Sequence, residues 1–203
     1  MSQLRGAPRQ YWVALRAMVI FTIALGVIYP LVITAIGLVA PAQANGSLVS
    51  VDGTTVGSSL IGQSFTDKKG NALPQWFQSR PSAAGEGYDA GSSGGTNQGT
   101  ESETLIKQIR ERRATIAKSD GVDPASIPAD ALTASASGLD PQISPAYARQ
   151  QVSRIAGVRN LSEAKVTKLV DSAVTGRLLG YIGEPTVNVL ELNIALAKLY
   201  PSG

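Results

Sequence analysis

The sequence has no histidine and no cysteine among its 203 residues, which limits the chemistry that its side chains can do. Zinc sites with Cys or His ligands are excluded, as are haem sites with those ligands and nucleophiles activated by a Ser–His or Cys–His pair. A Ser–Lys dyad, a pair of carboxylates and a metal ion held by oxygen atoms stay compatible with the composition. None of the three has a recognisable motif, so we predict no catalytic residue and no metal site.

Two hydrolase types stay open as alternatives. A Ser–Lys dyad needs a desolvated lysine with a lowered pKa, whereas Lys107, Lys165 and Lys168 fall on polar faces of predicted helices. A carboxylate pair needs two acids separated by roughly 5–9.5 Å. Asp140 and Glu184 are the candidates for such a pair, but nothing in the sequence places them together.

One apolar segment, Ala17 to Ala40, positions the rest of the chain. It has 24 residues and no charge, and as a helix it is roughly 36 Å long, enough to cross a hydrocarbon core of about 30 Å. Arg5, Arg9 and Arg16 precede it, and basic flanks stay in the cytoplasm. We therefore predict a single-pass membrane protein with a cytoplasmic tail (1–16), a transmembrane helix (17–40) and an extracytoplasmic domain (45–203).

The same segment has a second interpretation as a secretory signal. Ala42-Gln43-Ala44 fits a cleavage site after Ala44, and cleavage would release a free exported binding protein. The apolar run is much longer than the ~7–15 residues of a signal core, which favours a retained anchor. Pro30 is placed to kink the helix, and Gly26, Pro30 and Gly37 are candidates for packing against neighbouring helices.

The charges outside the anchor balance. Three of the 18 Lys and Arg precede the apolar segment, and all 15 Asp and Glu follow it, so the exported part is formally neutral. A nucleic-acid partner requires a clustered basic face, and we predict none. The absence of Cys also means that the exported domain is not a disulfide scaffold.

Local patterns in the exported part predict an α+β domain. Asp52-Gly53 predicts a two-residue hairpin turn between short strands, and Leu178 to Ile182 predicts another strand. Helices are predicted from Thr100 as N-cap, from Ser144 with Pro145 at N1 to about Gly157, from Ser162 to a stop at Gly176, and after the N-cap Asn188.

Several motifs taken together resemble the C subunit of the Kdp potassium-transporting ATPase. Each alone is weak, but they follow one another in order over nearly the whole chain. They are Gly57-Ser58-x-Leu60-Ile61-Gly62-Gln63, Ser79-Arg80-Pro81-Ser82-Ala83, Tyr88-Asp89, Ser93-Gly94-Gly95-x-Asn97, Ala134-Ser135-x-Ser137-Gly138-Leu139-Asp140-Pro141, Ile143-Ser144-Pro145 and Gly183-Glu184-Pro185-x-Val187-Asn188-Val189-Leu190-x-Leu192-Asn193.

The resemblance implies a non-catalytic accessory subunit of an ATP-driven potassium uptake complex in the bacterial cell (inner) membrane. Its partners would be a channel-like potassium-binding subunit, a P-type ATPase catalytic subunit and a small single-span subunit. It implies a catalytic chaperone that raises the ATP affinity of the pump, with ATP as a ligand but no intrinsic cofactor. The chain departs from the family pattern at two sites where histidines are usual, Gln142 and Ala173-Val174-Thr175.

ATP is cytoplasmic, whereas the charge flank predicts an exported domain. We therefore expect the domain to act by docking on its partners and holding the complex together. The candidate docking residues are Arg80, Pro81, Ser82, Gly94, Gly95, Asn97, Ser137, Gly138, Asp140, Pro141, Gly183, Glu184 and Asn188.

Overall fold

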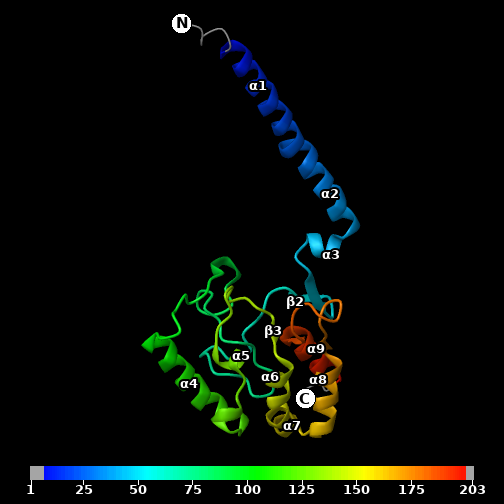
Figure 1. The fold of residues 1–203 in the computed structure, drawn as a ribbon. Helices are drawn as coiled ribbons and strands as arrows, with labels where there is room; N and C mark the ends of the chain where they lie inside the picture. The colour runs from blue at the N-terminus through cyan, green and yellow to red at the C-terminus, as the bar shows by residue number, and fades with distance from the viewer. Residues whose placement is uncertain (1–6, 200–203) are drawn as a thin grey trace. The chain divides into compact units, whose positions relative to one another are not determined.

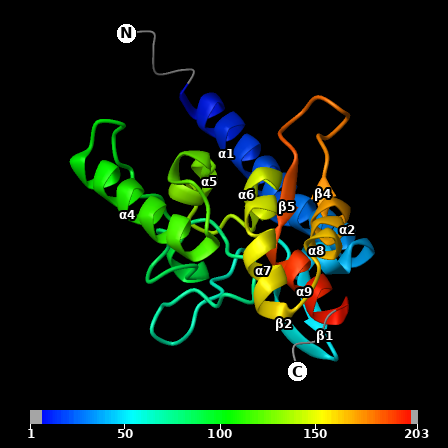
Figure 2. The same ribbon diagram turned by 90° about the horizontal axis from the view of Figure 1, so that it is seen from below.

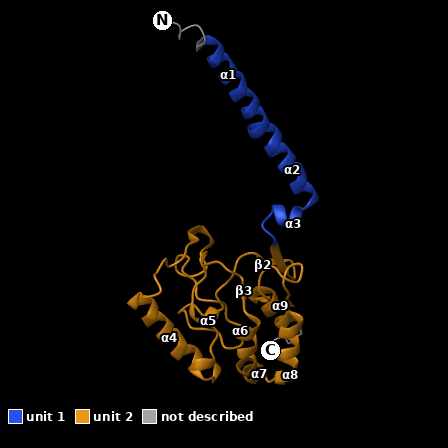
Figure 3. Cartoon of the chain, viewed as in Figure 1, with its two compact units in different colours: residues 1–47 blue, residues 48–203 orange. Residues whose placement is uncertain are grey.

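The computed structural model describes residues 7–199, which divide into two compact units between Ser47 and Leu48 (Figures 1 and 3). Residues 1–6 of the predicted tail, which include Arg5, and residues 200–203 of the predicted domain lie outside the described part. Each unit is described by itself. The second unit combines helices with two small sheets, so the predicted α+β class is confirmed.

The first unit is a long apolar helix followed by a short one. Helix α1 (Ala7–Ile23), a π-helical turn η1 (Ala24–Ile28) and α2 (Tyr29–Val39) run on without a break, and α3 (Pro41–Ala44) follows. The stretch Pro8–Val39 is long and apolar enough to cross a membrane. It contains nearly all of the predicted span, while the side of the membrane on which each flank lies stays a prediction.

The π-helical turn has its cause in Pro30. Proline has no N–H to give to the carbonyl four residues earlier, and its ring crowds that carbonyl. The chain responds by widening the preceding turn, so that the Tyr29 N–H bonds to the Ala24 carbonyl five residues back. Gly26 and Gly37 leave room on the helix surface, with Thr22 Cγ2 and Ala44 Cβ as the nearest atoms to an added Cβ, at 4.0 and 3.4 Å.

The second unit begins with the predicted hairpin. Strands β1 (Leu48–Val51) and β2 (Thr54–Ser58) pair antiparallel, with an irregularity between Val49 and Ser50. Asp52 and Gly53 both have positive φ, 50° and 78°, as a type I′ turn requires. The hairpin prediction is confirmed.

A second, three-stranded antiparallel sheet has the order β3-β5-β4. Its strands are β3 (Gln142–Ile143), β4 (Val174–Thr175) and β5 (Thr186–Asn188). The strand predicted at Leu178 to Ile182 is wrong. That segment is a tight reversal with a single bridge between its two end residues, because Leu179 and Gly180 both adopt positive φ, 54° and 83°.

The helices of the second unit are η2 (Ala90–Ser92), α4 (Glu103–Asp120), η3 (Pro124–Ser126), α5 (Ala129–Leu132), α6 (Pro145–Gln150), α7 (Val152–Arg159), α8 (Glu163–Ser172) and α9 (Val189–Leu199). Of these, α6 and α9 contact β5, whereas α4 lies apart from the sheet (Figure 2). Buried apolar side chains from α6 to α9, the sheet and Phe77 make one core, in which Ile155, Leu192 and Leu196 have no exposed surface.

Two of the predicted helix caps are confirmed. Ser144 Oγ accepts the Tyr147 N–H at 3.0 Å, and Asn188 Oδ1 accepts the Glu191 N–H at 3.2 Å. Helix α4 begins later than predicted, because Ser102 rather than Thr100 supplies the N-cap oxygen, to the Leu105 N–H at 3.5 Å. Helix α8 ends at Ser172 rather than at the predicted Gly176, because the chain passes into β4 after Ala173.

Candidate functional site

Two buried amide side chains fix the extended segment that leads into the site. Asn193 Oδ1 accepts the Phe77 N–H at 2.9 Å, and its Nδ2 donates to the Phe77 carbonyl at 3.0 Å. Gln151 repeats the pattern on the next residue, with Gln78 N–H to Oε1 at 2.6 Å and Nε2 to the Gln78 carbonyl at 3.2 Å. These side chains supply the partners that a neighbouring strand would give, so the segment is held in place without belonging to a sheet.

Arg80 follows directly and joins two loops that are far apart in sequence. Its Nη1 donates to Asp140 Oδ2 at 2.9 Å, and its Nη2 donates to the Thr133 carbonyl at 3.4 Å. The Tyr88 hydroxyl donates to the Arg80 carbonyl at 2.8 Å. We call residues 80–97 and 133–141 together the two-loop cluster.

Short hydrogen bonds continue the contact between the two loops. Ser82 Oγ donates to the Gly138 carbonyl at 2.6 Å and accepts the Tyr88 N–H at 2.8 Å. The Gly94 N–H and Ser93 Oγ both donate to the Ser137 carbonyl, at 2.9 and 3.0 Å. The loops therefore hold each other in one arrangement, although the short helix η2 is the only regular element that the structure describes within residues 80–97 and 133–141.

Two glycines let the backbones come this close. A Cβ on Gly138 would lie 2.7 Å from the Ala84 nitrogen and 2.7 Å from the Gly94 oxygen, and its φ is +68°. A Cβ on Gly95 would lie 2.8 Å from the Ala136 oxygen. Both positions exclude a side chain, since the atoms closest to the added Cβ belong to the backbone, which cannot move aside as a flexible side chain can.

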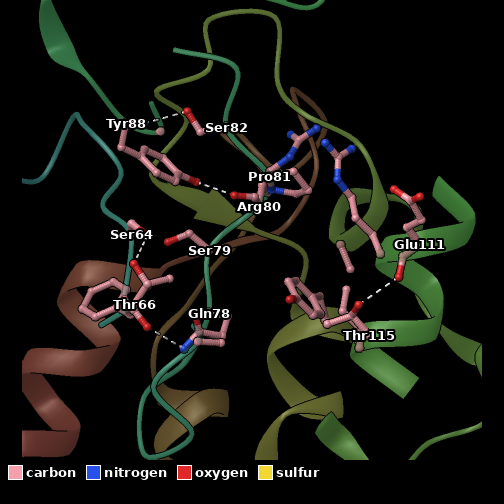
Figure 4. Close-up of a pocket in the computed structure, with 17 residues that line it drawn as sticks. Ser64, Thr66, Gln78, Ser79, Arg80, Pro81, Ser82, Tyr88, Glu111 and Thr115 are labelled. Carbon is pink, nitrogen blue, oxygen red and sulfur yellow. Dashed lines mark hydrogen bonds between the residues drawn. The ribbon is translucent and has the colours of Figure 1, made fainter. Parts of the chain in front are cut away.

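A pocket of about 430 Å³ opens beside the cluster (Figure 4). Arg80, Ser82 and Tyr88 form one wall, and Glu111 and Thr115 of α4 form the opposite one. Arg112 also lines it and donates from Nη1 to the Leu132 carbonyl at 2.9 Å, while burial lowers the pKa of its guanidinium. Apolar side chains, among them Phe65, Ile116 and Tyr147, line the pocket together with these polar groups.

The described residues offer little support for hydrolysis. Lys107 has 77% of its side chain exposed, and Lys165 and Lys168 are also exposed, so none has the desolvation that a Ser–Lys dyad requires. Asp140 pairs with Arg80, whereas Glu184 pairs with Arg177 Nη2 at 2.6 Å in another loop. Residues 7–199 contain no group of three Asp or Glu that could hold a metal ion.

The sequence profile described as "K+-transporting ATPase, c chain", KdpC, matches residues 11–198. The chain belongs to the KdpC family. A potassium-transporting ATPase KdpC subunit of Kineococcus radiotolerans is 52% identical over 193 residues, which cover 95% of both chains. Subunits of the same name from Caulobacter vibrioides and Caldanaerobacter subterraneus are 52% and 50% identical over 191 and 184 residues, covering 93% and 88% of this chain and 92% and 90% of theirs. The resemblance seen in the motifs is confirmed.

The KdpC-family motifs fall into two groups in the structure. Those around Arg80, Ser82, Gly94, Gly95, Ser137, Gly138 and Asp140 meet in the two-loop cluster. Pro81 lines the pocket, Pro141 accepts the Val189 N–H at 3.0 Å, and Asn97 adopts a left-handed φ of 52°. Gly183 and Glu184 instead lie in the loop between β4 and β5, and Asn188 joins α9 to Ser59 through Nδ2 at 2.8 Å.

Sequence reasoning missed the residues that position the cluster. Gln151 and Asn193 each had one usable signal, an amide close to apolar core residues: Asn193 lies on α9, and Gln151 lies between α6 and α7. A buried amide must find partners, and here the partners are the backbone groups of an extended segment. Nothing local identified that segment as residues 77–78.

The hydroxyl of Tyr88 gives a test of the cluster at alkaline pH. Burial raises the pKa of Tyr88 to about 12, and the negative charge of Asp140 adds to the effect. Because the folded state holds this proton more tightly than an unfolded tyrosine with a pKa of about 10, its contribution to stability is complete below pH 10 and is lost as pH rises towards 12.

We therefore expect the thermal midpoint of the wild-type chain to fall more steeply between pH 10 and 12 than that of Tyr88→Phe. Circular dichroism of the full chain in detergent measures both. Tyr181→Phe serves as the control, because Tyr181 is 72% exposed. Identical slopes for wild type and Tyr88→Phe would contradict the buried hydroxyl.

Proposed function

We propose that this KdpC-family chain is a non-catalytic accessory subunit of an ATP-driven potassium uptake complex. Its partners are a channel-like potassium-binding subunit, a P-type ATPase catalytic subunit and a small single-span subunit. The family match over residues 11–198 supports this assignment, as do its relatives, which are named as potassium-transporting ATPase subunits.

The main support for a docking role is the two-loop cluster. Its hydrogen bonds fix a polar surface with a pocket of about 430 Å³ in advance of binding. A surface held in one conformation loses little conformational entropy when a partner binds. The lack of His and Cys in the sequence and the exposure of the three candidate lysines favour binding over covalent catalysis.

We propose that the long apolar helix anchors the chain in the membrane with its N-terminus in the cytoplasm. Arg9 and Arg16 on the described N-terminal side, with no acid before Asp52, support this orientation. The second unit then lies on the extracytoplasmic side, where it docks on the outer faces of the channel-like and pump subunits.

Any rise in the ATP affinity of the pump follows, in this proposal, from stabilising the assembled complex. Photoaffinity labelling of the purified complex with an azido-ATP analogue, competed by ATP, tests direct contact. Specific label on this chain would replace the purely structural explanation by one in which the chain itself contacts nucleotide.

Arg80→Ala tests the docking surface. It removes the guanidinium by which the 80–97 loop binds Asp140 and the Thr133 carbonyl of the 133–141 loop. The two loops then separate, and several-fold less complex should co-purify through a tag on this chain. Arg149→Ala is the matched control, because it breaks an ion pair with Asp171 whose side chains are 53% and 50% exposed. Unchanged complex yield and unchanged potassium uptake for Arg80→Ala would rule out the proposal.

A further inference from the structure

The loop between β4 and β5 ends in an uncovered group of large apolar side chains. Leu178, Leu179, Tyr181 and Ile182 are 66, 73, 72 and 47% exposed. We call residues 178–182 the apolar tip. Figure 2 shows this loop extending away from the rest of the second unit. A contiguous exposed apolar group of this kind marks an interaction site more often than scattered single residues do.

Hydrogen bonds hold the apolar tip in a defined shape. The Leu178 N–H donates to the Ile182 carbonyl at 2.9 Å, and the Ile182 N–H returns a bond of 3.0 Å. The Gly180 N–H donates to the Arg177 carbonyl at 3.1 Å. Below the tip, Arg177 Nη2 and Glu184 Oε2 close the loop with an ion pair of 2.6 Å.

Leu179 lies at the turn with a left-handed φ of 54°, a conformation that glycine and asparagine adopt more readily than leucine. A local requirement for the turn alone would favour one of those two residues. The leucine therefore places an exposed apolar side chain at a position where the backbone disfavours it. This combination points to a use for the side chain itself.

We infer that the apolar tip docks into an apolar pocket on another subunit of the potassium-transporting complex. The core of a protein interface is depleted of charge, contains aliphatic and aromatic anchors and is bordered by polar residues. The tip follows this pattern, with Leu179 and Tyr181 as anchors and the Arg177–Glu184 pair at the border. The inference deepens the proposed docking role and rests on it.

The charges of the loop favour a protein over a lipid surface. Segments that lie on a bilayer combine their apolar residues with free Lys or Arg that attract anionic headgroups. The only cation within residues 177–184 is Arg177, and Glu184 neutralises it. The loop thus carries no net charge to hold a headgroup.

Site-specific crosslinking in the intact complex tests the inference. Benzoylphenylalanine is placed at position 179 or 181 of the full chain, which is expressed with the other Kdp subunits in membranes and irradiated. Position 158 is the control, because Val158 is also an apolar residue exposed at 49% but lies on α7. We expect adducts to another subunit from positions 179 and 181 and none from 158.

Retention of this chain on a tagged partner subunit measures how much the apolar tip contributes to binding. Leu179→Asn combined with Tyr181→Ser removes both anchors, and asparagine accepts the left-handed backbone, so the thermal midpoint should stay unchanged. We expect retention on a tagged partner to fall at least about tenfold, the loss typical of an interface anchor. Val158→Ser should retain wild-type binding.

The outcomes separate this inference from the docking role as a whole. Adducts only to lipid or to a second copy of this chain would overturn the inference that the apolar tip docks into another subunit. Full retention of the double variant would also overturn it. If benzoylphenylalanine at position 93, in the two-loop cluster, crosslinks to a partner subunit in that case, the proposed docking role of the cluster stands. If positions 93, 179 and 181 all give no protein adduct, both the tip and the proposed docking role fail.

Discussion

Asp120→Ala should destabilise the second unit by about 3–5 kcal/mol, because it leaves a buried cation without its counter-ion. Arg154 Nε and Asp120 Oδ1 lie 2.7 Å apart, and their side chains are only 6% and 4% exposed. Gln150 Nε2 donates to the other carboxylate oxygen at 3.1 Å. Arg154 also binds the Pro74 and Trp76 carbonyls, so the pair joins the end of α4 and the start of α7 to the segment that leads into the site.

For a domain of this size, such a loss corresponds to a fall of roughly 6–20 °C in the thermal midpoint. Circular dichroism of the full chain in detergent measures it. Asp171→Ala is the matched control, since the Arg149–Asp171 ion pair has a similar N–O distance, 2.9 Å, but its side chains are about half exposed. An exposed pair contributes about 0–1 kcal/mol. Equal midpoints for the two variants would show that the Asp120 pair is not buried in solution.

The local features of the fold could be predicted from the sequence, because their causes lie within a few residues. Asp52-Gly53 supplies its own turn, Ser144 and Asn188 cap the helices that follow them, and Pro30 acts on the preceding turn of its helix. The error at α4 has the same origin. Thr100 and Ser102 are both good N-caps, and the sequence alone does not decide between two such residues placed this close together.

The short strands of the second sheet could not be predicted. Strands β3 and β4 have two residues each, which is too few to show an alternating pattern. They exist because β5 lies between them and Val187 packs into the core. At Leu178 to Ile182 the apolar composition favoured a strand, but the left-handed backbone of Leu179 turns the chain back instead.

The motif residues of the candidate site were identified, but their contacts were not. Arg80 and Asp140 are 60 residues apart, and Ser82 and Gly138 are 56 apart. No local pattern reports on such pairs. The role of these residues in docking stays a prediction, while the structure shows that most of them hold the two loops together.

Gly138→Ala should separate these loops. The alanine would have to adopt φ of +68°, which costs about 1–2 kcal/mol. Its Cβ would also lie 2.7 Å from the Ala84 nitrogen and the Gly94 oxygen, and overpacking of this kind costs about 1–3 kcal/mol. We expect a total loss of about 2–5 kcal/mol. Both neighbours are backbone, so the loops themselves must move to relieve the contact.

Gly94→Ala is the matched control in the same cluster. Its nearest atom to an added Cβ is the Ser92 oxygen at 4.0 Å, so the side chain fits without displacement. We expect Gly138→Ala, but not Gly94→Ala, to expose the 80–97 loop to limited proteolysis and to reduce co-purification of partner subunits. Proteolysis without loss of partners would show that the two-loop cluster serves only the fold. Proteolysis together with loss of the partner subunits would show that the closed arrangement of the cluster is the form that partners bind.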